Sequence, residues 1–237
     1  MQIKQFTNRT DNYFYAIIGN DFTAIIDPAE PEQVIPLLRA NNIIPTHVIS
    51  THHHADHTGA NLDLKRLYGV KILGGKDDAD KIPGIDQELQ DQDKILNDSA
   101  IIMTTPGHTL GHICVYFPKA SALFTGDCIF NLGAGRLFEG TPEQAFNSFQ
   151  KIKALPPETL IYCGHEYAAA NSKFALAIAP DNPHLLPRFE DIQRKTEQNQ
   201  PTVPFSLKDE LLTNPFVQAK NPEEFAHIRQ LRNEFKA

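Results

Sequence analysis

The chain has 237 residues, 41% of them hydrophobic and 22% charged, which is the composition of a folded globular protein of one large domain or one domain with a small partner. Its 29 acidic and 22 basic residues give a formal net charge of −7. This balance argues against a protein whose main partner is nucleic acid or an anionic membrane. The sequence carries no apolar run of membrane-spanning length and does not start like a signal peptide, so we expect a cytoplasmic protein.

Short β-rich runs separated by turns and a few helices dominate the first two-thirds of the chain. Residues 13–19 and 22–27 predict the two strands of a hairpin, because the intervening Gly-Asn-Asp sequence is a turn signal. Apolar residues at helical spacing predict a helix over 32–40. Further strands are predicted at residues 46–51, 70–74, 100–105, 112–117, 121–126 and 159–164.

A change of pattern near residue 166 divides the chain. Before it, Thr141, Pro142 and Gln144 are an N-cap, a first-turn proline and a capping-box partner, and they predict a helix that ends near residue 155. After it, strand-like runs are absent and residues 200–206 are predicted to form a loop. Helices are predicted in this part at residues 167–179, 187–198 and 222–236. This order indicates an α/β or α+β core followed by a small helical domain.

The cysteines predict neither a disulfide framework nor a cysteine-based zinc site. There are three, an odd number, and no two have C-x-x-C spacing. We therefore expect Cys114, Cys128 and Cys163 to be small buried side chains.

The strongest chemical signal is the sequence HHHADH at residues 52–57, which holds four of the ten histidines. Its members His52, His54, Asp56 and His57 follow the pattern H-x-H-x-D-H. Imidazole nitrogens and carboxylate oxygens are ligands of divalent metals, and residues two apart in an extended segment point to the same side. The motif therefore predicts a metal site, and the remaining histidine of the window is interpreted as structural.

Three more residues of ligand type, His108, Asp127 and His165, each follow a predicted strand. Sheets bind ligands beyond the carboxyl ends of their strands, so these residues are expected to meet the H-x-H-x-D-H motif in one site. A single histidine is more often a hydrogen-bonded structural residue, and a single Gly-Asp is more often a turn. Their occurrence together with the motif argues against that interpretation. The histidines without such support are His47, His184, His227 and His112, the last of which is expected to form a hydrogen bond beside the site.

Seven ligands exceed the four that one zinc ion takes, so two metal ions are predicted. One ion is assigned to His52, His54 and His108, the other to Asp56, His57 and His165, and Asp127 is assigned to both. A water shared by two ions about 3.5–4 Å apart has a pKa lowered toward about 7, which makes hydroxide the expected nucleophile. Zinc, iron and manganese all accept these ligands, so the residues alone leave the metal open.

Together these motifs resemble the metallo-β-lactamase superfamily and, within it, the hydroxyacylglutathione hydrolase (glyoxalase II) family. The matching segments extend over nearly the full chain and are DNYFY, THHHADHTGAN, TPGHTLGHICVY, FTGDCIF, GRLFEGTPEQ, CGHEY, NSKFA, PTVPFSL and NPF. The resemblance implies an α+β fold, with an αββα catalytic sandwich over residues 1–165 and a small α-helical, glutathione-binding domain over 166–237. It also implies two divalent metal ions, for which we expect Zn²⁺, with iron or manganese as alternatives.

The activity that the resemblance implies is hydrolysis of S-D-lactoylglutathione, or another S-2-hydroxyacylglutathione, to the 2-hydroxy acid and glutathione. This is the second step of methylglyoxal detoxification. Hydroxide attacks the thioester carbonyl, and the leaving thiolate needs no general acid because its conjugate acid has a pKa of about 8.5. Asp56 and Asp127 are the expected catalytic residues through the metals that they hold, and a role of Asp56 as a base is an alternative.

Arginines on the last predicted helix are the expected partners of the glutathione carboxylates. Arg229 and Arg232 share a helix face beside an apolar stripe, an arrangement that by itself is more typical of a solvated surface. The resemblance assigns both to glutathione binding, together with Arg136 and Tyr167. Phe138 matches a further binding position, at which many eukaryotic members have a tyrosine, so a hydroxyl contact is lost there.

Several other functions are alternatives. Another hydrolase of the same fold, a lactonase or a different thioesterase, comes first, whereas a β-lactamase would carry a secretion signal and a persulfide dioxygenase would use one iron and fewer ligands. The net charge of −7 and the lack of a basic stripe disfavour a nuclease. A structural or storage metal site would have no open coordination position. We expect a monomer whose partner is a small glutathione thioester, not nucleic acid or membrane.

Overall fold

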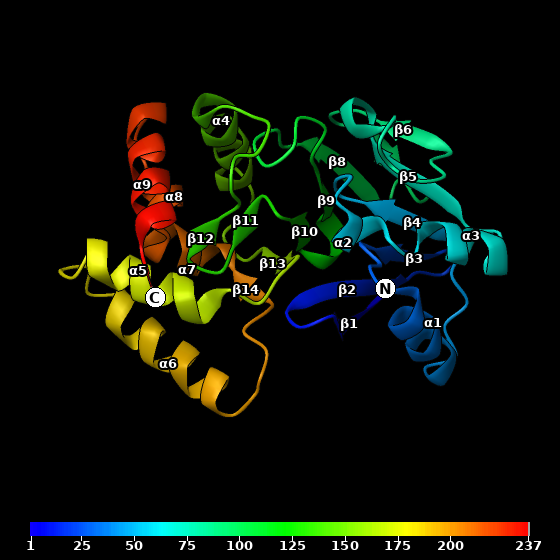
Figure 1. Cartoon of the computed structure of the whole chain (residues 1–237), viewed down its shortest axis with the longest axis horizontal. Helices are drawn as coiled ribbons and strands as arrows, with labels where there is room; N and C mark the ends of the chain where they lie inside the picture. Colours follow the sequence, from blue (N-terminus) through cyan, green and yellow to red (C-terminus); the bar gives the residue numbers. More distant parts are fainter. Residues whose placement is uncertain (237) are drawn as a thin grey trace.

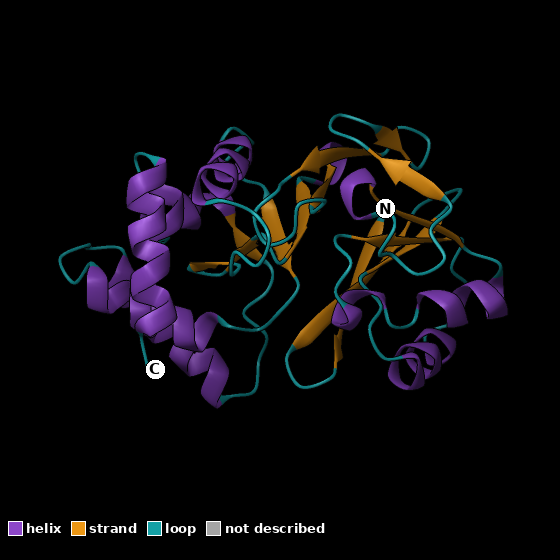
Figure 2. Cartoon of the chain, turned by 45° about the horizontal axis from the view of Figure 1, so that its top comes forward, coloured by secondary structure: helices purple, strands orange, loops and turns teal. Residues whose placement is uncertain are grey.

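Two six-stranded sheets face each other in the middle of the molecule, and helices cover the outer side of each sheet (Figure 1). Figure 2 shows the strands in the interior with helices on both sides. The computed structural model describes residues 1–236, so position 237, the last of the predicted helical domain, lies outside the described residues. This four-layer arrangement confirms the predicted αββα sandwich.

The first sheet begins with antiparallel strands and continues with parallel ones. In spatial order it consists of β1 (Gln2–Asn8), β2 (Asn12–Ile18), β3 (Thr23–Ile26), β4 (His47–Ser50), β5 (Lys71–Gly75) and β6 (Gln87–Leu89). The predicted hairpin is confirmed, because β2 and β3 pair antiparallel around the expected turn. The predicted strands at 46–51 and 70–74 are β4 and β5.

The second sheet brings the carboxyl ends of three strands to one edge. In spatial order it consists of β14 (Phe205–Ser206), β13 (Leu160–Cys163), β10 (Ala122–Gly126), β9 (Ile113–Phe117), β8 (Ala100–Thr104) and β7 (Lys94–Ile95). Strand β9 is antiparallel to both β8 and β10, and β13 is parallel to β10, so β8, β10 and β13 run in the same direction. A small hairpin of β11 (Ile129–Phe130) and β12 (Gly133–Ala134) follows β10.

The helices form the two outer layers and a C-terminal group. They are α1 (Pro31–Ala40), α2 (Ala55–Thr58), α3 (Asn61–Tyr68), α4 (Pro142–Lys153), α5 (Ala168–Ile178), α6 (Leu185–Glu197), α7 (Leu207–Thr213), α8 (Pro215–Gln218) and α9 (Pro222–Glu234). The capping box predicted for α4 is present, with Thr141 accepting from the Gln144 amide and the Gln144 side chain accepting from the Thr141 amide. Every helix among residues 1–236 is too short or too polar to cross a bilayer.

Strand β2 shows why the sandwich forms, because it is buried on both faces. Tyr13 and Tyr15 point into the core between the sheets, while Phe14 points into the core that α1 and α3 cover. The Tyr15 ring meets the Phe124 ring of the second sheet edge to face, at 5.1 Å between centroids. A strand buried on both faces carries a nearly continuous apolar run, and residues 13–18 are such a run.

The two outer layers are built differently. Val34 and Leu38 of α1 are fully buried against the first sheet. On the outer side of the second sheet, α4 packs against α8 and α9 from the C-terminal part, and the Phe149 and Phe225 rings lie 5.1 Å apart (Figure 1). Helices α5 and α6 pack on each other beside this layer. The C-terminal part therefore shares its core with the sandwich.

The expectation that no strand follows residue 166 is wrong. Residues 205–206, predicted as part of a loop, form β14 at the edge of the second sheet, where Phe205 pairs with Ile161. Helices α7 and α8, with N-caps Ser206 and Asn214, also lie in a stretch for which no helix was predicted. A two-residue strand shows no periodicity, and a helix of four or seven residues shows little, so tertiary contacts decide these elements.

Candidate functional site

The predicted ligands lie where strands of both sheets end. His52 follows β4 of the first sheet, whereas His108, Asp127 and His165 follow β8, β10 and β13 of the second. The two sheets are joined at this edge by backbone hydrogen bonds, from the Tyr13 amide to the Gly164 carbonyl oxygen and from Ile113 to Thr51, both 2.8 Å long. The ligands therefore do not lie at the end of a single open sheet. They lie where the two facing sheets meet.

The first triad, His52, His54 and His108, brings three ring nitrogens together. The Nδ1 atom of His54 lies 3.0 Å from His52 Nε2 and 3.0 Å from His108 Nε2. The second triad, Asp56, His57 and His165, is similar, with 3.2 Å between the two Nε2 atoms and 3.7 and 3.5 Å from Asp56 Oδ2 to His57 and His165. Ligands of one tetrahedral zinc ion, each about 2.1 Å from it, lie roughly 3.4 Å apart. Both triads fit one ion each.

Asp127 lies between the two triads. Its Oδ1 atom is 3.4 Å from His57 Nε2, and its Oδ2 atom is 3.4 Å from His165 Nε2 and 3.5 Å from His108 Nε2. The buried Oδ1 atom has no hydrogen-bond partner among the described residues. Burial would raise the pKa of this carboxyl, but the imidazoles of His57 and His165 outweigh it and hold the pKa well below its usual range. An ionised, buried oxygen without a partner calls for a cation.

The two triads and Asp127 together comprise seven residues, called the ligand cluster below. The backbone passes so close to this cluster that two positions beside it have no room for a side chain. A Cβ atom at Gly164 would lie 2.5 Å from Asp127 Oδ1 and 2.7 Å from His57 Cε1. Gly126 has φ of +44°, which favours glycine, and a Cβ there would lie 2.2 Å from Thr51 Oγ1. Glycines directly before the ligands Asp127 and His165 therefore leave space for the cluster.

Oxygen atoms on the far side of the imidazoles fix the ring orientations. Asp27 Oδ2 lies 3.1 Å from His57 Nδ1 and accepts from Thr51 Oγ1, which in turn lies 3.0 Å from His52 Nδ1. The Nδ1 atoms of His108 and His165 are held by the Arg136 carbonyl oxygen at 2.8 Å and by Asp11 Oδ1 at 3.2 Å. With Nδ1 occupied, Nε2 faces the ligand cluster in each ring, as in metal sites whose ligands are oriented by hydrogen bonds.

The sequence reasoning missed these orienting residues. Asp27 directly follows β3, so it carries the same strand-end signal that identified Asp127. Asp11 lies in the segment DNYFY, together with Asn12, whose Nδ2 atom donates to Asp56 Oδ2 at 3.1 Å. Neither aspartate belongs to a spaced pattern that would have assigned it to a site. His112 forms the hydrogen bond expected beside the site, because its Nε2 atom accepts from the Asp127 amide at 3.2 Å.

Burial and charge separate the histidines of the ligand cluster into two kinds. Burial, reinforced by neighbouring imidazoles, lowers the pKa of His52 and His54, so these rings are neutral and have free lone pairs. Burial would also lower the pKa of His57, but Asp127 and Asp27 outweigh it and raise the pKa to about 9. Without a metal, the carboxylates therefore hold a proton on His57, in the place where a cation fits.

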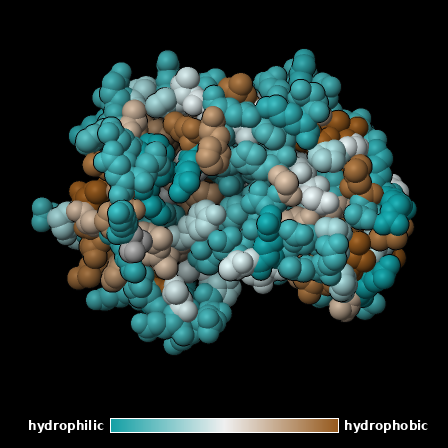
Figure 3. All heavy atoms as spheres, viewed as in Figure 1, coloured by the Kyte–Doolittle hydropathy of each residue, from teal (hydrophilic) through white to brown (hydrophobic). Residues whose placement is uncertain are grey.

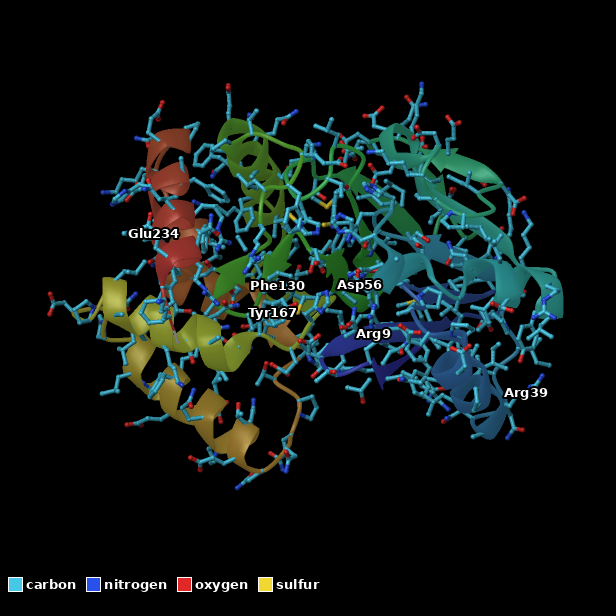
Figure 4. The ribbon with its side chains drawn as sticks, in the orientation of Figure 1. Arg9, Arg39, Asp56, Phe130, Tyr167 and Glu234 are labelled. Atoms are coloured by element: carbon cyan, nitrogen blue, oxygen red, sulfur yellow. The ribbon has the colours of Figure 1, made fainter. Side chains whose placement is uncertain are left out.

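A cavity of about 380 Å³ opens directly onto the ligand cluster. Its lining includes His108 and Asp127 from the cluster and all five residues predicted to bind substrate, which are Arg136, Phe138, Tyr167, Arg229 and Arg232. Figure 4 shows Asp56 on one side of this central region and Phe130 and Tyr167 on the other. The Tyr167 ring stacks on His165, with 4.8 Å between centroids, and Phe138 is 62% exposed at the rim.

The two arginines of α9 differ in their surroundings. Arg229 is only 7% exposed, and its Nη1 atom donates to the Ala134 carbonyl oxygen at 2.8 Å. Burial and the charges of Arg232 and Arg136 lower the pKa of Arg229 to about 10. Arg232 is half-buried and donates from Nε to Asn171 Oδ1 at 3.3 Å. Three guanidinium groups thus face one cavity whose only lining acid among the described residues, Asp127, already faces imidazoles.

Comparisons with known proteins agree with this architecture. Residues 8–165 match the family model described as the metallo-beta-lactamase superfamily. Residues 166–235 match the model described as hydroxyacylglutathione hydrolase C-terminus. The two matches therefore account for almost the whole chain.

Individual relatives are similar over similarly long stretches. A Pelagibacter ubique (strain HTCC1062) protein named hydroxyacylglutathione hydrolase is 45% identical to the chain, covering 99% of the chain and 100% of the relative. The crystal structure of ETHE1 from Myxococcus xanthus is 26% identical and covers 97% of this chain and 90% of its own, with a TM-score of 0.73. The structure of TTHA1623 in a di-iron-bound form is 25% identical and covers 70% of this chain and 92% of its own, with a TM-score of 0.61. The chain belongs to the hydroxyacylglutathione hydrolase family of the metallo-beta-lactamase superfamily.

Proposed function

We propose that the protein hydrolyses the thioester of S-D-lactoylglutathione, or of a related S-2-hydroxyacylglutathione, to a 2-hydroxy acid and glutathione, the second step of methylglyoxal detoxification. The observation that carries the proposal is the cavity of about 380 Å³ that joins the ligand cluster to three arginines. A hydrolytic centre at one end and positive charge at the other suit a reactive acyl group attached to an anionic peptide. Relatives named hydroxyacylglutathione hydrolase support the same substrate class.

The ligand cluster is proposed to hold two divalent ions, most simply Zn²⁺, with iron or manganese as alternatives. His52, His54 and His108 would hold one ion, Asp56, His57 and His165 the other, and Asp127 both. When bound, such ions lower the pKa of water and polarise a carbonyl group. The partnerless Oδ1 atom of Asp127 and the short separations between ring nitrogens support this assignment. Asp56 and Asp127 are catalytic in this proposal, because they would hold the metal ions at which the reaction takes place.

The arginines are proposed to bind the glutathione carboxylates. Arg232 and Arg136 offer guanidinium groups at the cavity, and a planar guanidinium matches a carboxylate with two parallel hydrogen bonds. Arg229 adds charge, while its contact with the Ala134 carbonyl oxygen keeps the cavity wall in place. Tyr167 and Phe138 provide apolar surface for the peptide, and Phe138 offers no hydroxyl group.

Departure of the product is proposed to need no acid from the protein. Glutathione leaves as a thiolate, and a thiol of pKa about 8.5 is a far better leaving group than an amine or an alcohol. Tyr167 is a poor proton donor, because burial and then the charge of Asp11 raise its pKa. The residues at the cavity therefore suit a thioester better than a substrate whose leaving group must be protonated.

We further propose that the chain is divided into a catalytic domain over 1–165 and a glutathione-binding domain over 166–237, and that it acts as a monomer in the cytoplasm. The two family matches, which meet between residues 165 and 166, support this division. Figure 3 supports the monomer, because apolar residues on the face it shows occur in small separate groups around a mainly hydrophilic centre. Three unpaired, buried cysteines and a glutathione substrate agree with a reducing compartment.

The decisive assay compares S-D-lactoylglutathione with a lactone and a β-lactam on one preparation, with its metal content measured. We expect the thioester to be hydrolysed with a kcat/KM at least about 100-fold above that for the other two. A lactone hydrolysed better than the thioester would replace the proposal with a lactonase, and a thioester lacking glutathione hydrolysed equally well would indicate another thioesterase.

A further inference from the structure

A buried carboxylate outside the ligand cluster links the two loops that carry the first triad. Asp78, at the end of the short helix Lys76–Asp78, is completely buried. Its Oδ2 atom accepts from the His53 amide at 3.2 Å and from Thr109 Oγ1 at 2.8 Å, and its Oδ1 atom accepts from the Gly111 amide at 3.0 Å. One carboxylate therefore holds His53, which lies between the ligands His52 and His54, and also Thr109 and Gly111, which follow the ligand His108.

The backbone comes unusually close at this point. A Cβ atom at Gly111 would lie 2.2 Å from the Asp78 amide nitrogen, so the loop after His108 rests directly on the Lys76–Asp78 turn. A second carboxylate, Glu139, accepts from the Leu110 amide at 2.9 Å and lies 3.5 Å from His53 Nε2. The two loops thus have a common anchor that uses none of the metal ligands.

One ligand atom each from His53, Asp78 and Glu139 lies within 4.8 Å of the others, close enough for a metal ion, but the contacts of these residues argue against that use. The His53 ring turns Nδ1 toward Asp78, 3.0 Å away but outside hydrogen-bond geometry, and Nε2 toward Glu139, and one ion cannot take both nitrogens of a ring. Both Asp78 oxygens already accept hydrogen bonds from backbone or hydroxyl donors. Glu139 pairs with Lys81 at 2.9 Å. The contacts are those of a hydrogen-bonded anchor.

We propose that Asp78 is a positioning residue that holds the first triad in its binding geometry. The proposal rests on the two-metal function proposed above. All three ligands of the first triad lie on the two loops that Asp78 joins. The second triad has separate supports, since Asp27 holds His57 and Asp11 holds His165. Loss of the Asp78 carboxylate should therefore weaken metal binding by the first triad and leave binding by the second triad unchanged.

The test is a titration of the metal-free full-length protein with Co²⁺ and with Zn²⁺, which gives the number of ions and both affinities without any substrate. The variant Asp78→Asn keeps the side-chain volume. Its amide group, however, turns an N–H donor toward a group that donates a hydrogen bond to the carboxylate in the wild type, so that hydrogen bond is lost. We expect the ion of the first triad to lose affinity by about 10-fold to 100-fold, and the ion of the second triad to change less than twofold. Thr109→Val, which removes one link and keeps the shape, should show a smaller change of the same kind.

Two controls show which triad is affected. Asp86→Asn changes an exposed carboxylate that also accepts from a backbone amide, that of Ile72 at 2.9 Å, but does not touch the ligand loops, and it should leave both affinities unchanged. In a His165→Ala background the remaining ion occupies the first triad, and Asp78→Asn should weaken this ion by the same factor.

The proposal is overturned if Asp78→Asn and Thr109→Val both keep wild-type affinities, or if they weaken both ions equally, as a general loss of stability would. An effect that vanishes in the His165→Ala background would also overturn it. A wild-type protein that binds two ions but does not hydrolyse the thioester would refute the proposed function and leave this inference intact.

Discussion

The charges around Asp127 make the ligand cluster favourable for a cation. Without a cation, the same arrangement destabilises the folded protein. The carboxylate is 7% exposed and faces imidazole nitrogens at 3.4–3.5 Å. Neutral lone pairs that face each other, as in His52 and His54, repel unless a proton or a metal ion lies between them. A metal ion in place of a proton would neutralise the Asp127 carboxylate and accept the lone pairs of the neutral rings. The charges of the cluster therefore favour metal binding.

The variant Asp127→Ala should lose most of its metal and at least about 100-fold in kcat/KM, because the residue links both triads. Metal per chain after dialysis and thioester hydrolysis are the measurements. Asp63→Ala is the matched control, since Asp63 forms only an exposed ion pair with Arg66. A purified Asp127→Ala protein that retained two ions and full activity would show that the carboxylate does not bridge.

The variant Arg232→Ala should raise KM for the glutathione thioester by about tenfold with little change in kcat. A hydrogen bond to a charged group contributes about 1.5 kcal/mol or more, which is a factor of ten in affinity. Arg194→Ala, which removes an exposed ion pair with Asp191, is the control. If KM stays unchanged in Arg232→Ala, this side chain does not contact the substrate.

The variant Arg229→Ala should raise KM as well, and in addition it should lower the free energy of unfolding by about 1–3 kcal/mol. The reason is that Arg229 is buried against the Phe216 ring, at 5.2 Å, and donates to the Ala134 carbonyl oxygen. Urea denaturation measures the loss. Wild-type stability together with a raised KM would mean that the backbone contact contributes nothing to the fold.

At the residue scale, the sequence predicts ligand types well and their supports poorly. His108, Asp127 and His165 were identified because predicted strands precede them, and the structure brings all three to the H-x-H-x-D-H motif. Asp11 and Asp78 lie in segments whose local pattern is that of ordinary turns. Their roles arise from contacts with residues 154 and 25–33 positions away, which no local spacing encodes.

Among the elements, the β11–β12 hairpin shows how a polar network shapes the cavity. Glu210 of α7 is completely buried, pairs with Arg188 of α6, and accepts from the Leu132 amide at 3.2 Å and from Asn214 Nδ2 at 2.6 Å. Asn214 Nδ2 also donates to the Gly133 carbonyl oxygen at 3.1 Å. The hairpin that leads to Arg136 is therefore held by helices of the C-terminal part.

The variant Glu210→Ala should destabilise the protein by about 3–5 kcal/mol, because it leaves the Arg188 charge and the Leu132 amide without their buried partner. The midpoint of urea unfolding is the measurement. Glu190→Ala, at an exposed position of α6, should stay within about 0.5 kcal/mol of the wild type. A loss below about 1 kcal/mol in Glu210→Ala would mean that the network is not a main support of the hairpin.

Most of the longer elements were predicted, but β1 and α3 were missed, and so were the elements of two to four residues that have no pattern of their own. Helix α9 was identified from Asn221, whose side chain accepts from the Glu224 amide as an N-cap should, and from its apolar stripe. Strands β7, β11, β12 and β14 have two residues each, too few to show alternation. Strands β7 and β14 form because the longer strands β8 and β13 present unpaired backbone groups to them, whereas β11 and β12 pair only with each other. Both conditions exist only in the assembled fold.

At the scale of the whole molecule, the ligand cluster joins the two sheets. The first triad takes two ligands from the first sheet and one from the second, and the second triad does the same. The C-terminal part completes the cavity that opens onto this junction. Bound metal should therefore act as a cross-link between the two halves of the sandwich, in addition to its chemical role.

Removal of metal by a chelator should lower the melting temperature by about 5–10 °C, because an ion at 100 times its Kd stabilises the folded state by about 2.7 kcal/mol. Zn²⁺ or Mn²⁺ should restore the value. Mg²⁺ is the control and should not, because it disfavours imidazole ligands. Differential scanning calorimetry measures the change, and equal melting temperatures with and without chelator would argue against the cross-link.

The central claim is that seven side chains from two sheets bind a pair of metal ions beside the arginine-lined cavity. The most direct measurement is an anomalous difference map of a crystal of the metal-loaded protein at the absorption edge of its metal. The account predicts two peaks about 3.5–4 Å apart, one within each triad and both next to Asp127. A single peak, or peaks remote from these side chains, would contradict it.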